Sequence, residues 1–405
     1  MLFVEYCDQM DMKIEDRMLI FNKVMYNIQN YFAHWKSIPN IQIDELYKEF
    51  INRIIKADNR YKFAIVMKEF MAKFKNTHTW YNDSLLWNMH GAAIPFNAVY
   101  HDYEKKWVVI LSKIKEIVPG TIIEGIDNER LEDFYNQKKA YLSASSDRIA
   151  RNSLFGNPWL FPQQFTMTTG DHKTVRITRS NENSCIQKLE VTAKYISDGI
   201  AYISIPTFGT KKAVKDATNC VKKFKKYKKL IIDLRGNDGG DTPIWLLKSL
   251  MNKRYRRFCY TKIVPKDALS IMTNVRLGKK LVRSYKTEIP KYKHPAKNPY
   301  SGKIVILVNQ TTMSAAEDFI FPFKDNKRAK IIGIHTAGSN GDTYVDNYKN
   351  EIFIGVGSVV VTFPNDSKFE GIGIKPDKEV YPSIKDIKEN RDTILEAAIK
   401  SLKSI

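Results

Sequence analysis

The sequence has few cysteines, few turn-forming residues and no long apolar run. Its 405 residues include 4 cysteines, 19 glycines and 15 prolines. The scattered cysteines exclude a disulfide scaffold and a zinc cluster, and the low glycine and proline content excludes collagen-like and low-complexity chains. No apolar stretch approaches the roughly 18 residues that a membrane-spanning helix needs. With 43% hydrophobic and 12% aromatic residues, the composition predicts a globular protein with a sizeable core.

The N-terminus lacks the basic start and the long apolar stretch of a secretory signal. Residues 1–16 instead carry acidic side chains early. We therefore expect no signal peptide in the sequence as given.

Acidic residues are scarce relative to basic ones. The chain holds 65 Lys and Arg against 44 Asp and Glu, a formal charge of +21, and nearly all of the excess lies in residues 211–230 and 251–300. The first segment is expected to be the solvated face of a helix. No stacking aromatics or groove-reading motif accompanies the lysines, so no nucleic-acid partner is expected. A polyanion-binding protein is the alternative that this charge leaves open.

Hydrophobic spacing divides the chain into three regions. In residues 1–90, apolar side chains such as Leu46, Phe50 and Ile54 recur every three to four positions, which predicts a helical domain. Residues 91–190 contain short strand-like runs and turns, which predict a small β-rich module.

Residues 191–405 alternate strands with helices. Continuous apolar runs at 230–234, 303–309 and 329–334 are typical of buried strands, and residues 211–229 show the pattern of an amphipathic helix. The third region is therefore predicted to be an α/β domain.

A glycine-rich loop follows the buried strand at 230–234. Gly239 and Gly240 are consecutive, and glycines of this kind let backbone N–H groups face a ligand without a Cβ in the way. The chain lacks the spacing of a phosphate-binding loop. Asp233 and Arg235 are expected to pin the loop rather than to take part in chemistry.

Ser314 lies where the strand at 303–309 and its loop pass into a helix. A side chain at a helix N-terminus faces free N–H groups, which favour developing negative charge. The alternative is that Ser314 only caps the helix, as serine commonly does.

Four ordered motifs resemble the C-terminal processing peptidase family, also called the tail-specific proteases, which includes the tricorn core protease. The motifs read Asp233-Leu-Arg235-Gly-Asn237-Asp-Gly239-Gly240, Asn309-Gln-Thr-Thr312-Met-Ser314-Ala-Ala-Glu317, Gly333-Ile-His-Thr336-Ala-Gly338 and Gly371-Ile-Gly373-Ile-Lys-Pro376-Asp377. The resemblance covers most of the chain. It implies a crotonase/ClpP-like strand-helix spiral core in residues 191–405, with a PDZ-like module in residues 91–190.

The resemblance implies a serine endopeptidase with Ser314 as nucleophile. One branch of the family activates this serine with a lysine after the Thr-x-Gly motif, but here that position is Ser339. The tricorn-like branch uses an upstream histidine and a glutamate, which correspond here to His78 and Glu370. His78 would take the serine proton, and Glu370 would orient the imidazole and stabilise its charged form. Thr77 stands where that branch has a serine, so its hydroxyl is a candidate for the relay.

The oxyanion of the reaction is expected to bind backbone N–H groups of Ala315 and of Gly239 or Gly240. The sequence does not decide which of the two glycines supplies the N–H group. No cofactor or metal is implied.

Several motif residues have other interpretations. His335 is expected to be a strand-end residue, and Glu317 a first-turn acid that stabilises its helix. Glu370 is also compatible with a surface loop. A catalytically inactive relative that binds peptides is the alternative function.

The expected partners are peptides or unfolded proteins. The second basic segment contains Lys279, Lys280, Arg283 and Lys286 and lies in sequence between the glycine loop and Ser314, so we expect it to favour acidic peptides or an anionic surface. The PDZ-like module is degenerate, because no clear carboxylate-binding loop precedes a strand. The family favours a periplasmic or cell-envelope location if a leader precedes this sequence, and oligomeric state is not predicted.

Overall fold

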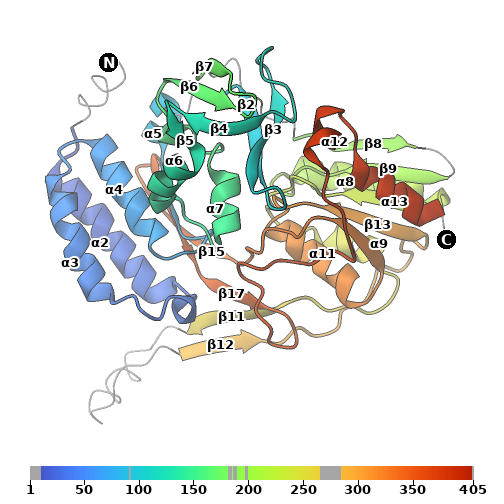
Figure 1. The fold of residues 1–405 in the computed structure, drawn as a ribbon. Coiled ribbons are helices and arrows are strands. Elements are labelled where there is room, and N and C mark those ends of the chain that lie inside the picture. The colour runs from blue at the N-terminus through green and yellow to red at the C-terminus, as the bar shows by residue number, and fades with distance from the viewer. Residues whose placement is uncertain are drawn as a thin grey trace, which may run out of the picture.

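The structure is a computed structural model of the chain. It describes residues 11–90, 93–180, 185, 189–196, 199–264 and 284–403. Three parts surround the centre of the molecule: N-terminal helices, a β-rich module and a larger α/β core (Figure 1).

The N-terminal helices are those that the three-to-four spacing predicted. They are α2 (Ile14–Tyr31), α3 (Ile43–Lys56) and α4 (Arg60–Ala72), with a short helix η1 (Trp35–Ser37) between the first two. Leu46, Phe50 and Ile54 form the buried face of α3. The helices lie side by side in Figure 1 and share one apolar cluster.

A three-stranded sheet joins these helices to the C-terminal half. After α4 the chain forms β1 (Trp80–Asp83) and α5 (Ser84–His90), and β1 pairs with β16 (Ile352–Gly357), which pairs in turn with β15 (Thr343–Tyr348). Side chains of β16 belong to the apolar cluster of the N-terminal helices. This pairing fixes the segment just before β1 against the C-terminal half of the chain.

The β-rich module contains one sheet, two α-helices and two short 3₁₀ helices. Its strand order is β2-β3-β4-β6-β7, with β5 beside β4. The strands are β2 (Phe96–His101), β3 (Lys106–Ser112), β4 (Ile122–Ile126), β5 (Glu129–Arg130), β6 (Gln164–Thr169) and β7 (Thr174–Thr178). The helical segments are α6 (Leu131–Lys138), η2 (Lys139–Tyr141), α7 (Asp147–Ser153) and η3 (Pro158–Leu160). Short strands were predicted for this region in general, whereas α6 and α7 were not.

The core is a six-stranded sheet in the order β18-β14-β13-β10-β9-β8. The strands are β8 (Thr192–Tyr195), β9 (Ile200–Ser204), β10 (Lys229–Asp233), β13 (Lys303–Val308), β14 (Ala329–Gly333) and β18 (Lys378–Glu379). All neighbouring strands are parallel except β8 and β9. The predicted buried strands at 230–234, 303–309 and 329–334 are thus confirmed within a residue or two at each end.

Helices cover both faces of the core sheet, as the continuous apolar strands require. On one face lie α8 (Lys211–Lys223), α9 (Ile244–Leu250) and α11 (Ala315–Asp325), and on the other lies α13 (Thr393–Lys403), which α12 (Ile384–Lys388) precedes. The lysines of α8 are exposed and its buried side chains are Ala213, Ala217 and Val221.

The predicted helix over 211–229 ends earlier than expected. After α8 a short helix η4 (Phe224–Lys226) turns the chain into β10. Phe224 and Tyr227 still pack on the core, so the apolar pattern continued beyond the end of the α-helix.

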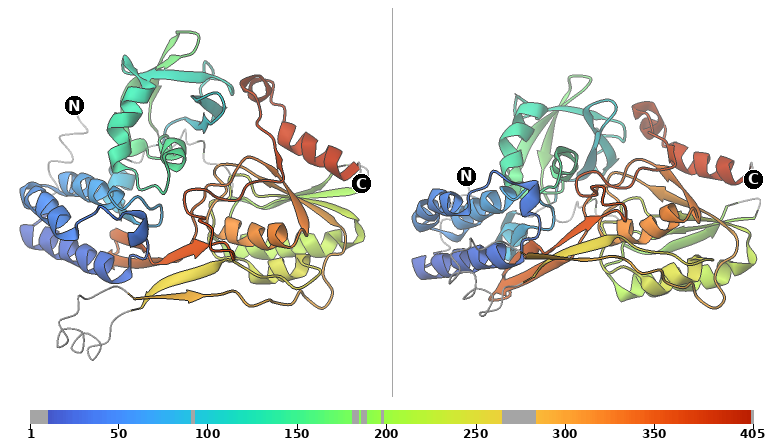
Figure 2. Two further views of the ribbon diagram at one scale, coloured as in Figure 1. Left: turned by 60° about the horizontal axis from the view of Figure 1, so that its bottom comes forward. Right: turned by 90° about the horizontal axis from the view of Figure 1, so that it is seen from below.

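A further sheet has the order β12-β11-β17. Its strands are β11 (Cys259–Val264), β12 (Ser284–Glu288) and β17 (Val359–Thr362). Figure 2 shows the β11–β12 pair extending from the core toward the N-terminal helices. Within the described residues, no helix is long and apolar enough to cross a bilayer.

Candidate active site

Ser314 is held at a strained turn between β13 and α11. Its backbone has φ +57° and ψ −124°, a region that L-residues other than glycine rarely adopt. The Ser314 N–H donates to the Ser339 carbonyl at 2.8 Å and to Glu317 Oε2 at 3.2 Å. These contacts hold the serine at the N-terminus of α11, with its side chain partly exposed.

His78 lies beside Ser314, although 236 residues separate them in the sequence. Its Nε2 is 3.4 Å from Ser314 Oγ and its Nδ1 is 3.0 Å from Ser339 Oγ. Burial lowers the pKa of His78 to about 4, against the opposing effect of the Asp342 charge. The imidazole is therefore neutral near pH 7 and able to accept a proton.

Glu370 approaches this histidine through Ser339. Its Oε1 lies 3.4 Å from Ser339 Oγ, and no hydrogen bond joins Glu370 to His78 in the described part of the chain. The Ser339 hydroxyl stands between the two groups, so any orienting effect of Glu370 on the imidazole passes through Ser339. Glu370 is 6% exposed, and burial raises its pKa to about 7, while the Ser145 and Ser339 hydroxyls and the nearby Asn340 backbone N–H lower it.

Ser145 is the second hydroxyl on Glu370. It precedes α7 in the β-rich module and donates a hydrogen bond to Glu370 Oε1. Asn76 Nδ2 donates to the same oxygen at 3.2 Å. The carboxylate is thus bound by three parts of the chain that are distant in sequence.

Thr77 contacts Ser145 rather than the histidine or the nucleophile. Its N–H donates to Ser145 Oγ at 3.0 Å, its Oγ1 lies 3.0 Å from Ser145 Oγ, and this Oγ1 accepts from Ser145 N–H at 3.1 Å. The Thr77 hydroxyl therefore positions Ser145, one contact away from Glu370.

The glycine loop lies against Ser314. A Cβ on Gly239 would be 2.7 Å from Ser314 Cβ and 3.1 Å from Ala315 N, so only glycine fits there. The Gly239 N–H donates to Asn237 Oδ1 at 2.9 Å. By contrast, Gly240 is exposed, and neither its N–H nor that of Ala315 has a hydrogen-bond partner among the described residues.

Glu317 has a larger role than the first-turn acid that the sequence indicated. It is fully buried. Its carboxylate accepts hydrogen bonds from Gly338 N–H at 2.8 Å, from Ser339 N–H at 3.1 Å, from Ser314 N–H and from the Thr336 hydroxyl. Burial raises its pKa to about 8 against the opposing effect of these hydrogen bonds. Glu317 therefore fixes the loop that carries Ser339 to the nucleophile.

The remaining motif residues lie around this centre. Arg235 pairs with Asp233 and Asp392 and so pins the glycine loop, as expected. His335 follows β14, and its Nε2 lies 3.7 Å from Glu379 Oε1. No group of His, Cys, Asp and Glu suited to a metal ion occurs within the described residues.

Residues 199–380 match the model of peptidase family S41. The chain carries a peptidase family S41 domain. This domain makes the protein a serine peptidase, which is a hydrolase. No curated protein sequence gives a significant match.

Solved structures share the fold of the S41 domain and its flanking parts. Mature CPAF has a TM-score of 0.71 at 16% identity, covering 96% of this chain and 97% of that chain, and CPAF complexed with lactacystin has 0.70 at 14%, covering 96% and 98%. The photosystem II D1 C-terminal processing protease has a TM-score of 0.56 at 17% identity, covering 95% and 97%. At these identities the likeness concerns the fold.

Asn76, Ser145 and Ser339 were missed as parts of the site. Asn76 stands two residues before His78, and Ser339 directly follows the Thr-x-Gly motif, so both had a local signal. Ser145 had none, because its contact with Glu370 spans 225 residues.

Proposed function

We propose that this S41 domain is an endopeptidase that cleaves peptide or unfolded protein substrates through an acyl-enzyme on Ser314. The observation that carries the proposal is the contact between Ser314 Oγ and His78 Nε2 at 3.4 Å. The distance is long for a hydrogen bond, but catalytic hydrogen bonds commonly shorten when substrate binds. Ser339 occupies the position of the lysine in the other branch, so the proposal places the chain in the tricorn-like branch.

In the proposed reaction His78 accepts the Ser314 proton at Nε2 while Oγ attacks the scissile carbonyl. The Nδ1–H group donates to Ser339 Oγ, and the Ser339 hydroxyl donates to Glu370 Oε1. This chain fixes the tautomer that leaves Nε2 free, and the Glu370 charge stabilises the imidazolium. Thr77 acts through Ser145, which holds Glu370.

The tetrahedral oxyanion is proposed to bind the N–H groups of Gly240 and Ala315. Both groups lack a hydrogen-bond partner within the described residues, whereas the Gly239 N–H donates to Asn237. The role of Gly239 is then steric, since its missing Cβ makes room for Ser314. His78 returns its proton to the leaving amine, and water hydrolyses the acyl-enzyme by the same base.

Three units are proposed for this function: a helical unit at 1–90 that supplies His78, a degenerate PDZ-like module at 91–190, and a catalytic unit at 191–405. For the catalytic unit we propose a crotonase/ClpP-like strand-helix spiral. The parallel core sheet and its covering helices are compatible with that architecture.

A preference for acidic peptides is proposed from the second basic segment. Lys279, Lys280 and Arg283 lie outside the described residues, and Lys286 is exposed on β12. Neutralising these four residues should lower the rate at which acidic peptides are cleaved and make that rate less dependent on salt concentration. If neither quantity changed, this preference would be contradicted.

A fluorophosphonate probe tests the nucleophile. The wild type should be labelled, and the Ser314→Ala variant should not. Ser367→Ala is the matched control, since it removes an exposed hydroxyl but leaves Ser314 and its relay in place. Labelling of Ser314→Ala would move the nucleophile elsewhere, and an unlabelled wild type would favour the inactive peptide-binding relative.

A further inference from the structure

A basic pocket lies at the opposite end of the core sheet from Ser314. It is a cavity of about 650 Å³ where β13 and β14 begin and where α9 and α11 end. Ser314 follows the other end of β13, and the six residues of this strand span about 17 Å at the usual rise per residue. A ligand in the basic pocket would therefore not touch the catalytic centre.

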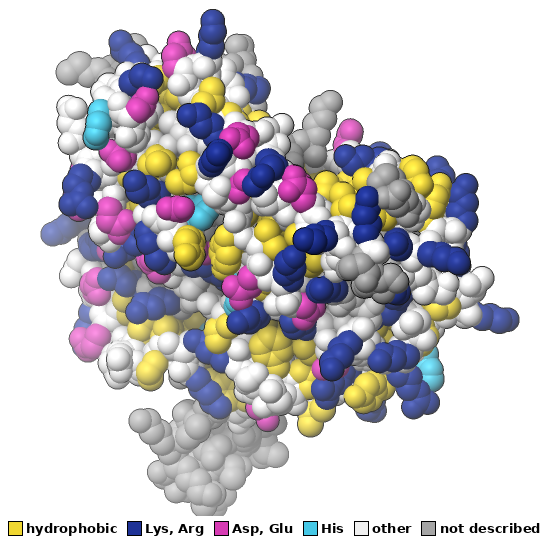
Figure 3. All heavy atoms as spheres, turned by 45° about the vertical axis from the view of Figure 1, so that its right-hand side comes forward, with side chains coloured by type: hydrophobic (Ala, Val, Ile, Leu, Met, Phe, Trp, Pro, Cys, Tyr) yellow, Lys and Arg dark blue, Asp and Glu magenta, His cyan; other side chains and the backbone are white. Residues whose placement is uncertain are grey.

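Cationic side chains dominate the lining of this pocket. Six of them come from three separate stretches of the chain: Lys253, Lys303, Lys324, Lys327, Arg328 and Lys330. One acid, Asp377, is also in the lining, and it is already engaged by Lys324 and by the Ile331 N–H. Figure 3 shows that lysine and arginine also prevail over much of the right-hand part of the molecular face seen there.

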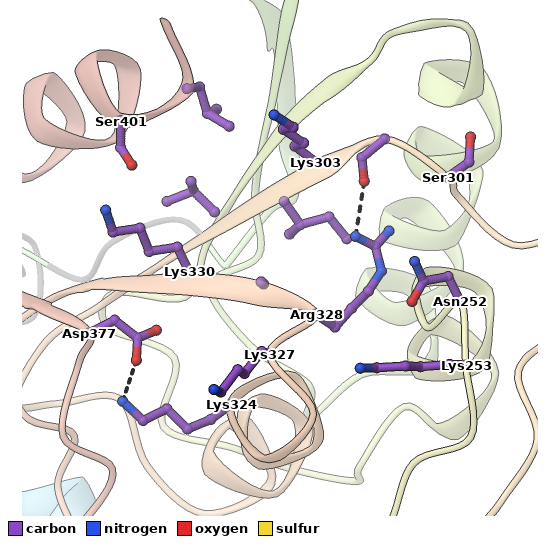
Figure 4. A pocket seen from close by; sticks show the side chains of 15 residues that line it. Asn252, Lys253, Ser301, Lys303, Lys324, Lys327, Arg328, Lys330, Asp377 and Ser401 are labelled. Atoms are coloured by element: carbon purple, nitrogen blue, oxygen red, sulfur yellow. Dashed lines mark hydrogen bonds and ion pairs between the residues drawn. The ribbon is translucent and has the colours of Figure 1, made fainter. Parts of the chain in front are cut away.

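Arg328 lines the pocket between Lys303 and Asn252 (Figure 4). Its guanidinium donates to the carbonyls of Leu250 at 2.8 Å, Gly302 at 2.9 Å and Tyr300 at 2.7 Å. No described carboxylate forms an ion pair with it, and its half-buried position lowers its pKa. A partly desolvated cation without a counter-charge is costly, and a bound anion would offset that cost.

The ends of α9 and α11 explain only part of this charge. Lysines near a helix C-terminus interact favourably with the helix dipole, which accounts for Lys324 and Lys327. Lys303 and Lys330 instead extend from the neighbouring strands β13 and β14, and both are exposed. Within the described residues, neither Lys327 nor Lys330 forms an ion pair.

We propose that the basic pocket binds a small ligand that carries two or more phosphate groups. Lysine ammonium groups are common phosphate partners, and Ser301, Ser401 and Asn252 add polar groups to the lining. The volume lies in the range of small-ligand sites, roughly 300–1,000 Å³. The cations surround a hollow instead of forming a stripe, which favours a compact ligand over a nucleic-acid backbone.

The test is calorimetric titration of the full chain with inorganic tripolyphosphate at constant ionic strength. The wild type should bind saturably, and the triple variant Lys253→Ala, Lys327→Ala, Lys330→Ala should bind about tenfold more weakly or worse, because each lysine supplies a charge-assisted contact. ATP is the second probe. An ATP affinity equal to that of tripolyphosphate would identify the phosphates as the recognised part, and tighter binding of ATP would indicate an additional contact with the nucleoside.

The matched control is Lys215→Ala, Lys222→Ala, Lys223→Ala, which removes the same charge from the exposed face of α8. This variant should keep wild-type affinity. Ser314→Ala should also keep it, because the pocket is remote from the nucleophile. If both triple variants bound tripolyphosphate equally weakly, the cause would be the net charge of the protein, and the proposed site would be refuted. The absence of saturable binding to the wild type would also refute it.

Discussion

Replacing Glu370 with glutamine would remove one charge and little else from the catalytic centre. Glu370 Oε1 takes the hydrogen bonds from Asn76, Ser145 and Ser339, whereas Oε2 is buried without a hydrogen-bond partner among the described residues. The glutamine oxygen can keep those three bonds while the amide occupies the Oε2 position. Glu370→Gln should therefore fold normally and lose the electrostatic support of His78.

The size of the loss follows from the distance between the two charges. Ser339 Oγ lies 3.0 Å from His78 Nδ1 and 3.4 Å from Glu370 Oε1, so these nitrogen and carboxylate oxygen atoms are at most 6.4 Å apart. At an effective dielectric constant of about 20, two unit charges at that distance attract by about 2.6 kcal/mol, and by more at any shorter distance. Losing this stabilisation in the transition state should lower kcat by about a hundredfold.

The pH dependence of kcat/KM checks the same reasoning. Burial raises the pKa of Glu370 to about 7 and lowers that of His78 to about 4. His78 is thus already neutral when Glu370 ionises, so wild-type activity should rise as pH passes through about 7. Glu370→Gln should lack this limb.

The assay is steady-state cleavage of a fluorogenic peptide from pH 5 to pH 9, with thermal unfolding to verify the fold. Glu389→Gln is the control, because it removes a carboxylate that is exposed near the end of α12. A Glu370→Gln variant with wild-type kcat and an unchanged pH profile would refute the role of Glu370. Equal losses in Glu389→Gln would assign the effect to overall charge.

The other predictions concern groups around Glu370 and Ser314. Ser339→Ala should leave His78 Nδ1–H without its acceptor and lower kcat by about a hundredfold or more with KM little changed; a change in KM alone would contradict the relay. Ser145→Ala removes a hydrogen bond that lowers the Glu370 pKa, so the rising limb of kcat/KM should move to higher pH, and an unmoved limb would separate Ser145 from the site. Gly239→Ala should abolish fluorophosphonate labelling, because its Cβ would meet Ser314 Cβ at 2.7 Å; full labelling would show that the loop can shift.

Arg148 joins α7 to the loop after β14. Its guanidinium donates to the carbonyls of His335 at 3.1 Å, Ala337 at 3.1 Å and Thr336. Near the same end of α7, Ser145 thus contacts Glu370 and Arg148 contacts the loop after β14, which explains how a module so distant in sequence contributes to the site.

The sequence by itself determined the local structure and the residues that stand in motifs. The spacing of Leu46, Phe50 and Ile54 identified the buried face of α3, because helical periodicity is a local property. Continuous apolar runs identified the core strands for the same reason. The strand-to-helix position of Ser314 and the glycine loop before α9 were also readable, since each depends only on neighbouring residues.

The tertiary structure alone decided how those residues are connected. Ser339 stands between His78 and Glu370, Ser145 arrives from the β-rich module, and Glu317 binds the backbone of a loop 21 residues away. The basic pocket likewise forms only where five separate segments of the chain meet. These contacts join groups that no local pattern relates, because hydrogen bonds and charge clusters depend on distances in the folded chain and not on spacing along it.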